Sequence, residues 1–164
     1  MTQPATRSVS QLSLPATTHS YLMRAAESLS EAVTSGEATT RYACAHVAAL
    51  RAAAALLAAR AKPAAPTRRK PQKNAWVLLA EVAPELAEWA GFFAAGAGKR
   101  AAAEAGSRRA VTEREADDLV RDADRFLAVV EQTLGLAPHA PTLPYLVPQP
   151  STSSVTLLSS RRVG

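Results

Sequence analysis

Alanine is the residue type that most constrains how this chain folds. The 164 residues include 37 alanines, 18 leucines and 12 valines but no isoleucine, and aromatic residues make up only 5%. Alanine has the highest helix propensity, whereas β-branched and aromatic residues are the ones that favour strands. We therefore predict an all-α fold, a compact bundle of four to five mostly antiparallel helices. Because an alanine side chain offers few atoms for contact, these helices must pack closely to gain dispersion energy.

The two ends of the chain differ in composition from the middle. Residues 1–15 are polar and lack hydrophobic periodicity, which predicts a disordered N-terminal arm. From Ala137 onward the sequence carries five prolines and then a run of Ser and Thr, which predicts a Pro/Ser-rich disordered tail over residues 137–164. The length leaves room for one ordinary domain, and we assign that domain to residues 16–136.

Cap and stop signals divide this domain into helical segments. The predicted helices cover about residues 17–34, 39–61, 74–105 and 112–134. The first two would begin at pairs of threonine cap residues, Thr17–Thr18 and Thr39–Thr40. The third follows Asn74 and should kink at Pro84, which lacks a backbone N–H. The last opens with the capping box Thr112–Glu115, which is the clearest start signal in the chain.

Cysteine content and apolar run length indicate the compartment. The single cysteine, Cys44, excludes an internal disulfide framework and a zinc site made of several cysteines. The first 20 residues lack the basic and apolar regions of a secretory signal, and runs such as Ala52–Ala59 are shorter than a bilayer span requires. We therefore predict a cytoplasmic protein with no membrane contact.

The segment R-Y-A-C-A-H, residues 41–46, is the strongest candidate for a catalytic site. Arg41 would neutralise a scissile phosphate, and His46 would move a proton to or from a ribose hydroxyl or a leaving oxygen. The segment lies at the start of the second predicted helix, whose N-terminus also favours an anion. These residue types therefore suit the cleavage of a phosphodiester.

The spacing of the two residues also permits a purely structural interpretation. At 100° per residue, Arg41 and His46 project about 140° apart around the helix, so one helix does not present them as a tight pair. Either Arg41 curls back from the first turn or a second copy of the site contributes. In the structural interpretation His46 lies at the edge of the apolar stripe, hydrogen-bonded to a neighbour, and Arg41 is solvated.

Several longer stretches carry a resemblance to a known family. The stretches R-Y-A-C-A-H-V-A-A-L-R-A-A-A, A-W-V-L-L-A-E-V-A-P-E-L-A-E-W-A-G-F-F and R-E-A-D-D-L-V-R-D-A make the chain similar to an actinobacterial branch of the HEPN superfamily, over about residues 20–135. The resemblance implies a bundle of four or five helices that tends to form homodimers. It also implies that Arg41 and His46 match the R-x(4–6)-H motif of HEPN ribonucleases, which need no metal and build a composite site from both protomers.

Three further patterns are assigned to structure rather than to chemistry. The string G-A-G-K-R, residues 96–100, lacks the first glycine and the Ser or Thr of a phosphate-binding loop and follows a helix, so its glycines are expected to allow close packing or end a helix. The acidic residues of segment 113–124 alternate with arginines and predict a charge-paired face, so we expect no metal site and no cofactor. The large aromatic residues are expected to form the core rather than a ligand pocket: Trp76, Trp89, Phe92, Phe93 and Phe126.

The net charge of +5 is unevenly distributed along the chain. Residues 16–136 hold 16 basic and 14 acidic residues, so the predicted domain is nearly balanced. One block near the third helix is basic without a single acid: Arg60, Lys62, Arg68, Arg69, Lys70 and Lys73. This block is either a solvated linker or a site for RNA or another nucleic acid, whose binding would be strongly salt-dependent.

These observations leave three functional hypotheses. The leading one is a homodimeric HEPN-like accessory or interaction module that contacts nucleic acid through residues 60–73. The second is a metal-independent endoribonuclease in which Arg41 stabilises the phosphate, His46 acts as general acid or base and Tyr42 orients the substrate. The third is a helical scaffold with no nucleic-acid role.

Overall fold

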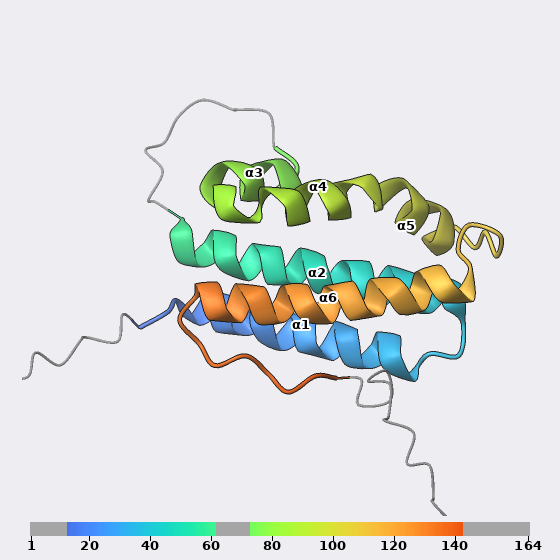
Figure 1. Ribbon diagram of the computed structural model, residues 1–164, viewed down its shortest axis with the longest axis horizontal. Helices are drawn as coiled ribbons and strands as arrows, with labels where there is room; N and C mark the ends of the chain where they lie inside the picture. The colour runs from blue at the N-terminus through green and yellow to red at the C-terminus, as the bar shows by residue number, and fades with distance from the viewer. Residues whose placement is uncertain (1–12, 62–72, 143–164) are drawn as a thin grey trace, which may run out of the picture.

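The computed structural model describes residues 13–61 and 73–142 (Figure 1). Its elements are, in chain order, α1 (Ala16–Thr34), α2 (Ala38–Arg60), α3 (Ala75–Val82), the 3₁₀ turn η1 (Pro84–Leu86), α4 (Ala87–Ala95), α5 (Ala97–Glu104) and α6 (Glu113–Thr133). These described ranges contain no strand. The all-α bundle predicted from the alanine content is confirmed.

Helix α2 lies at the centre of the bundle. It packs against α1 and α6, which run alongside it, and against α3 and α5, which belong to a second layer (Figure 1). That layer consists of α3, η1, α4 and α5, and it covers the side of α2 opposite α1. The helix that carries Arg41 and His46 is therefore enclosed by helices on several sides.

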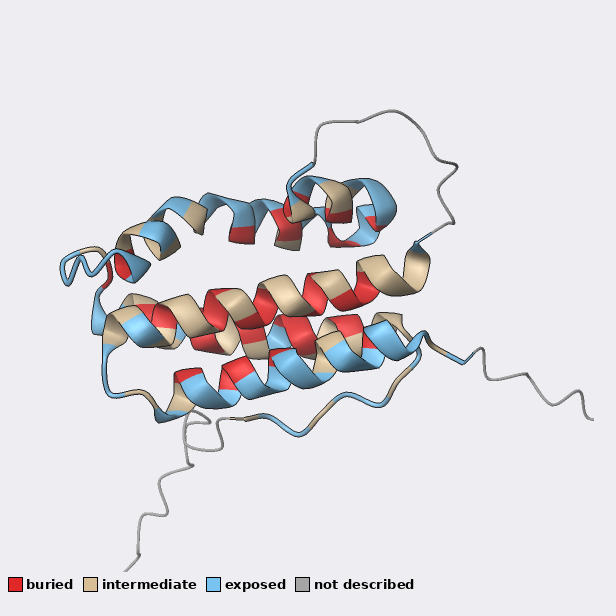
Figure 2. Ribbon diagram, turned by 180° about the vertical axis from the view of Figure 1, so that it is seen from behind, coloured by how far each residue is buried: buried red, intermediate tan, exposed pale blue. Residues whose placement is uncertain are grey.

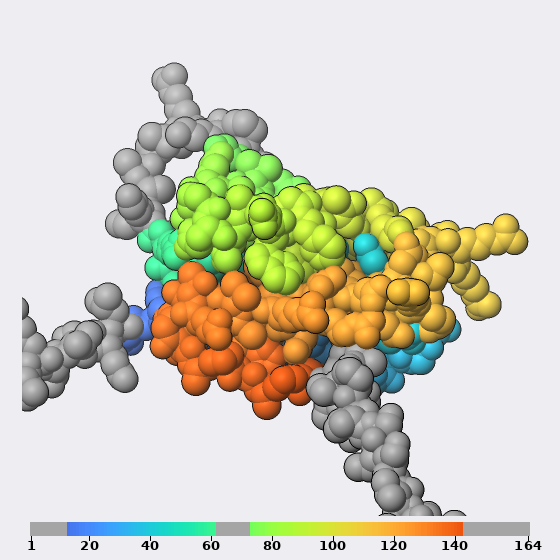
Figure 3. Space-filling model, in the orientation of Figure 1, coloured from blue at the N-terminus to red at the C-terminus, as the bar shows by residue number. Residues whose placement is uncertain are grey.

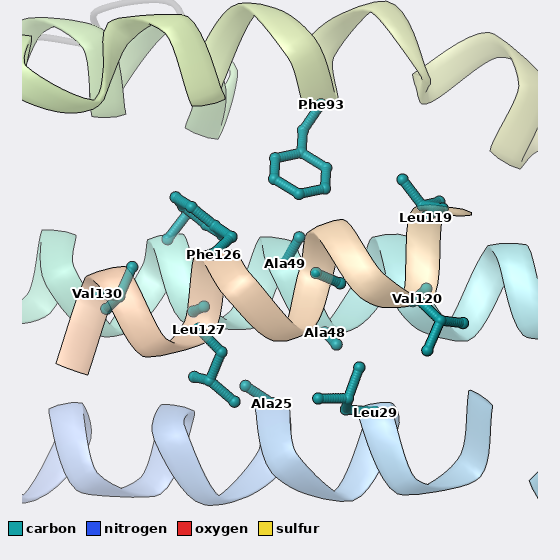
Figure 4. Close-up of a cluster of buried hydrophobic side chains, with 14 of the residues drawn as sticks. Ala25, Leu29, Ala48, Ala49, Phe93, Leu119, Val120, Phe126, Leu127 and Val130 are labelled. Carbon is teal, nitrogen blue, oxygen red and sulfur yellow. The ribbon is translucent and has the colours of Figure 1, made fainter. Parts of the chain in front are cut away.

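Small side chains line the buried surface of α2. Figure 2 shows buried positions along much of this helix, and the alanines among them are Ala45, Ala48, Ala49, Ala52, Ala53 and Ala55. The distance between two packed helices depends on the side chains at their contact, and alanine allows the closest approach after glycine. Leu29 of α1 and Leu127 of α6 belong to the same buried cluster as most of these alanines (Figure 4). These small side chains permit the close helix packing that the alanine content predicts.

Large aromatic side chains join the second layer to α6. Phe93 extends from α4 toward Phe126 of α6 (Figure 4), with 5.1 Å between the ring centroids. Trp76 of α3 stacks on Phe93 at 5.2 Å. All three rings are buried, which confirms their prediction as core residues, whereas Phe92 on the same helix is 47% exposed. Aromatic contacts of this kind contribute stability beyond the area that they bury.

Two of the predicted helix starts have the expected caps. The side chain of Asn74 accepts a hydrogen bond from the backbone N–H of Trp76 at 2.9 Å. Thr112 and Glu115 form the reciprocal capping box at the start of α6. Two breaks in the second layer were also predicted: Pro84 begins the 3₁₀ turn between α3 and α4, and Gly96 separates α4 from α5.

The threonine caps predicted for α1 and α2 were wrong. Helix α1 begins directly after Pro15, whose side chain cannot cap, and Thr18 lies inside the helix. The buried Thr18 hydroxyl instead donates a hydrogen bond to the carbonyl oxygen of Ala55 at 3.2 Å. Helix α2 begins at Ala38, before the predicted pair Thr39–Thr40, and has no side-chain cap. The local cap preference of Thr18 is thus overridden by a hydrogen bond between two helices.

Helix α2 also has the length and apolar character of a membrane-spanning segment. An 18-residue window within it has a mean hydropathy of 1.5, and half of that window is buried inside the bundle. The helix holds His46 in the core and Arg41 in ion pairs with α6. The core helix of a bundle can have the same length and hydropathy, and α2 packs against α1, α3, α5 and α6 as a core helix does.

The packed chain extends beyond the predicted end of the domain at residue 136. Gly135 has a positive φ of 76°, as expected for the residue that follows a helix, and the chain turns there. His139 and Thr142 then form hydrogen bonds with side chains of α6. Residues 1–12 of the predicted arm and 143–164 of the predicted tail lie outside the described residues.

The capping box at Thr112 should stabilise the fold measurably. We expect Thr112→Ala to lower the free energy of unfolding by about 1 kcal/mol, because the backbone N–H of Glu115 loses its acceptor. The matched control is Thr40→Ala, an exposed position in the first turn of α2, which should change stability by less than about 0.5 kcal/mol. Urea unfolding followed by circular dichroism measures both, and equal effects would contradict the assignment.

Candidate functional site

Arg41 lies at the end of the bundle where α2 and α6 begin. Its guanidinium forms ion pairs with Glu113 and with Asp117, whose Oδ1 is 3.2 Å from Nε. The same group donates hydrogen bonds to the carbonyl oxygens of Ser35 and Gly36, at 3.2 and 3.1 Å. Only 12% of the Arg41 side chain is exposed. The charge expected to meet a phosphate is thus neutralised by two carboxylates of the same chain.

His46 is part of the core. Its ring is 1% exposed and lies edge-on to Trp76 and Phe93, with centroids 5.8 and 6.1 Å away. Nε2 donates a hydrogen bond of 2.8 Å to the carbonyl oxygen of Phe93, because a carbonyl can only accept. Nδ1 is then an unprotonated acceptor, and among the described residues it has no partner. This imidazole is therefore fixed in one tautomer by the core.

The pKa of His46 is lowered from its ordinary value. Burial is the main cause, since it disfavours the imidazolium, and the nearby Arg100 acts in the same direction. The hydrogen bond to Phe93 and the charge of Glu104 oppose this shift without cancelling it. The ring is neutral at pH 7. It can accept a proton only at Nδ1, and that atom is buried.

Arg41 and His46 face different neighbours and do not meet within the chain. Arg41 contacts α6, whereas His46 contacts α3 and α4, as the angular separation predicted. In the space-filling view, the second layer and α6 meet over α2, and a small part of α2 is visible between α5 and α6 (Figure 3). The prediction that His46 is hydrogen-bonded to a neighbour agrees with this structure. The prediction that Arg41 is solvated was wrong, because Glu113 and Asp117 enclose it.

Gly96 allows the break between α4 and α5 to approach α2 closely. A Cβ atom added there would lie 2.9 Å from the hydroxyl oxygen of Tyr42 and 3.4 Å from Cδ2 of His46. The Tyr42 side chain is buried, which raises its pKa and leaves it little space to move away. The glycine string thus has the packing role expected of it at Gly96, whereas Gly98 has no atom within 4 Å of such a Cβ.

A lysine of the same string pairs with the capping box of α6. Lys99 forms an ion pair with Glu115, which also accepts hydrogen bonds from Thr112. These hydrogen bonds, with the one from Lys99 contributing most, lower the pKa of Glu115 to about 2. The pairing ties α5 to α6, and it places the only lysine of the second layer beside a carboxylate.

The predicted nucleic-acid-binding block is described only at its two ends. Arg60 pairs with Glu85 at 2.6 Å, and Lys73 pairs with Glu81 at 2.8 Å. The four residues between them lie outside the described residues: Lys62, Arg68, Arg69 and Lys70. The role predicted for this block stays a prediction, as does the catalytic role of Arg41 and His46.

The charge of the described bundle differs in sign from that of the whole chain. The described ranges contain 12 basic and all 14 acidic residues, so their formal charge is −2. The remaining seven basic residues lie in the segments 1–12, 62–72 and 143–164. The surface of the bundle is therefore not a basic one, and the charge that would attract a polyanion is carried by those segments.

The acidic start of α6 takes part in ion pairs. Arg114 and Arg121 both lie within ion-pair distance of Asp118, as the charge-paired face predicts. No group of three His, Cys, Asp or Glu side chains within residues 13–61 and 73–142 is placed to hold a metal ion. A cleft of about 420 Å³ opens beside this face, between the starts of α2 and α6, and Arg108 is its one basic lining residue.

Sequence reasoning missed the partners of Arg41 and of His139. The i,i+4 spacing of Glu113 and Asp117 was a usable signal, because it puts both carboxylates on one face of α6. His139 contacts Asp124 and Glu131, and nothing local in the sequence indicates that contact. It depends on the chain turning back at Gly135.

Comparisons with known proteins give one match. The model of the SAV_6107-like HEPN family matches residues 32–131, which is more than half of the chain and includes all helices from α2 to α5. No curated protein and no solved structure matches the sequence. The matched region contains Arg41, His46 and Gly96, whereas His139 lies outside it.

Substitutions at two neighbouring glycines should have opposite effects on stability. Gly96→Ala places a methyl group against the Tyr42 hydroxyl, and we expect it to lower the free energy of unfolding by about 1 kcal/mol or more. Gly98→Ala, inside α5 and in open space, should raise it by up to about 1 kcal/mol through helix propensity. Thermal and urea unfolding measure both, and a stabilising Gly96→Ala would contradict the close approach.

Proposed function

Because the chain belongs to the SAV_6107-like HEPN family, we propose that it is a homodimeric interaction module of the cytoplasm that binds nucleic acid without cleaving it. In this proposal the helical bundle forms the dimer, and residues 60–73 bind the nucleic acid. Metal-independent cleavage of RNA by Arg41 and His46 is the competing function.

The burial of His46 is the observation that carries this proposal. A general acid or base must come within hydrogen-bond reach of the group that gives or takes the proton. The His46 ring is 1% exposed, its Nε2 is bonded to Phe93, and its Nδ1 is enclosed by the core. A second protomer could not bring substrate to this ring unless α4 moved away from α2. A structural role for His46 requires no such movement.

The electrostatics of Arg41 favour the same function. An arginine that stabilises a phosphate needs donors that are free when the substrate arrives. Arg41 donates to two backbone carbonyls and is paired with Glu113 and Asp117. Those two carboxylates would also repel an approaching phosphate. The pairing suits a residue that joins α2 to α6.

Exposed apolar side chains supply a surface for a second copy. Phe92 of α4 is 47% exposed, and Val77 and Val82 of α3 are 49% and 38% exposed. All three lie on the second layer of the bundle, where Phe92 also packs edge-on to Trp89 at 6.4 Å. Exposed aromatic residues of this kind are enriched in protein interfaces. Dimer formation through this layer would remove them from water.

The basic residues of segment 60–73 support the nucleic-acid part of the proposal. Both ends of the segment are held by ion pairs to the second layer, through Glu85 and Glu81. The segment between them carries four basic residues and no acid. Phosphate contacts by such residues release counterions, so the binding would weaken as salt is added.

Light scattering on the purified chain tests the dimer. We expect a mass of about twice the 17.2 kDa of one chain at micromolar concentration. Phe92→Glu should shift the mass toward the monomer, because it places a charge in the proposed apolar contact. Met23→Glu is the matched control, since Met23 is 66% exposed on α1, and it should leave the mass unchanged. A monomer at that concentration would contradict the proposal.

Binding and cleavage are tested together on one labelled RNA in EDTA. Affinity should fall steeply as salt rises from about 50 to 200 mM, and the RNA should keep its full length. Replacing Arg68, Arg69 and Lys70 by Gln should weaken binding and reduce the slope of log affinity against log salt by about 2, which is about 0.7 per contact. Replacing the exposed Arg108 and Arg109 by Gln is the control and should leave both values unchanged.

Two results would overturn parts of this proposal. Cleavage in EDTA that is lost in Arg41→Gln and His46→Gln, while circular dichroism shows both variants folded, would establish the ribonuclease instead. Binding that the triple Gln variant leaves unchanged would remove the nucleic-acid role of residues 60–73.

A further inference from the structure

The chain that follows α6 forms a short strap on the bundle. After the turn at Gly135, residues 137–142 run back beneath α1 and α6 in Figure 1 and do not form regular secondary structure. We call these six residues the strap. It has two anchor points on α6, Asp124 and Glu131, which are seven residues apart and therefore lie on one face of the helix.

The strap is held by five hydrogen bonds to two carboxylate oxygens. The backbone N–H of His139 and its ring Nδ1 both lie 2.8 Å from Oε2 of Glu131. Its ring Nε2 lies 2.8 Å from Oδ1 of Asp124. The backbone N–H and the hydroxyl of Thr142 donate to the same Oδ1, at 3.3 and 2.8 Å. His139 is the centre of this arrangement, because it is bonded to both carboxylates.

When Asp124 and Glu131 are ionised, the geometry of the His139 ring requires a proton on each nitrogen. A carboxylate oxygen is an acceptor, so each of the two ring contacts needs an N–H donor. A neutral imidazole has one N–H and one bare nitrogen, and the bare nitrogen would face an anionic oxygen at 2.8 Å. The imidazolium has two N–H donors, and both contacts are then charge-assisted hydrogen bonds. Only the protonated ring satisfies both anchors.

We propose that residues 137–142 are a proton-controlled strap, closed on α6 when His139 is an imidazolium and released when the ring loses its proton. The contact is a regulatory device within one chain. It determines whether residues 137–142 are held along α6 or are free of it beyond the turn at Gly135. Release also uncovers the carboxylates of Asp124 and Glu131, which are 16% and 14% exposed with the strap in place.

The electrostatics of the site raise the pKa of His139, so the strap is released above the ordinary pKa of histidine. Burial alone would lower the pKa of His139, but the hydrogen bonds from Asp124 and Glu131, with their charges, outweigh burial and raise it. Within the described ranges, these two carboxylates are the charged groups that act on the ring, and both belong to α6. The strap contact is therefore fully present below about pH 6.5 and is lost as the pH rises through the raised pKa.

The buried His46 and the partly buried His139 respond to pH in opposite directions. His46 has a lowered pKa, so its contribution to stability is complete above about pH 6.5 and falls as the pH drops toward its folded-state pKa. His139 has a raised pKa, and its contribution falls as the pH increases. A measurement that reports on the strap must therefore be local, because global stability mixes both effects.

Hydrogen exchange and proton NMR of the full chain provide local measurements. The protection of the His139 and Thr142 amides should fall by about tenfold or more between about pH 5.5 and pH 8, because charge-assisted hydrogen bonds are lost. The fall should follow the titration of the His139 ring, and the ring should titrate above its ordinary value. The Phe126 amide within α6 should keep its protection, which separates release of the strap from unfolding of the helix.

Variants of the strap and its anchors complete the test. His139→Gln should leave both amides unprotected at every pH, and Glu131→Gln should move the titration of His139 toward lower pH. The matched controls are His19→Gln and Glu27→Gln on α1, where Glu27 is exposed, and neither should change the strap. Protection at His139 and Thr142 that is independent of pH, or unchanged in His139→Gln, would overturn the proposal.

Discussion

The close packing of α2 against its neighbours is the constraint on which the rest of the structure depends. Its buried surface consists largely of alanine, so each helix beside it can approach until backbone and Cβ atoms meet. The large side chains then come from the outer helices, as with Phe93 and Phe126 (Figure 4). A larger residue on α2 would separate the layers, and the aromatic contacts between α4 and α6 would be lost.

This packing explains why a motif with the spacing of a catalytic pair has structural roles here. The turn of α2 that carries His46 must fit beneath the break between α4 and α5, where Gly96 leaves the necessary space. The His46 ring fills that position and satisfies the Phe93 carbonyl at the end of α4. Arg41, about 1.4 turns earlier, reaches the start of α6. The two residues thus fasten α2 to different neighbours.

Much of the fold could be predicted from the sequence, because the deciding signals are local. Alanine content predicted the class, and Asn74, Pro84 and the Thr112–Glu115 box marked ends or breaks of helices through backbone chemistry that acts within a few residues. The cap predicted at Thr18 was wrong, because its hydroxyl donates a hydrogen bond to Ala55 of α2 rather than accepting one in the first turn of α1. At Thr18 the tertiary hydrogen bond replaces the local cap, whereas Glu115 keeps its cap hydrogen bonds while it pairs with Lys99.

The candidate site was less predictable for the same reason. The angular separation of Arg41 and His46 followed from helix geometry, but Glu113, which pairs with Arg41, is 72 residues away in the sequence, and Phe93, which bonds His46, is 47 residues away. The contacts of His139 depend on a turn at Gly135 and on the path of six irregular residues. Periodicity carries no information about such a path. These contacts depend on the tertiary arrangement of the helices and of the chain that follows them.

The positions of the two tryptophans give the protein a built-in optical reporter. Trp76 and Trp89 are the only tryptophans in the chain, and both stack on Phe93 within the second layer. Their fluorescence therefore reports on the docking of that layer against α2 and α6, whereas far-ultraviolet circular dichroism reports on helices throughout the bundle. Coincident transitions in the two signals would identify the layers as one cooperative unit, and separate transitions would identify them as two.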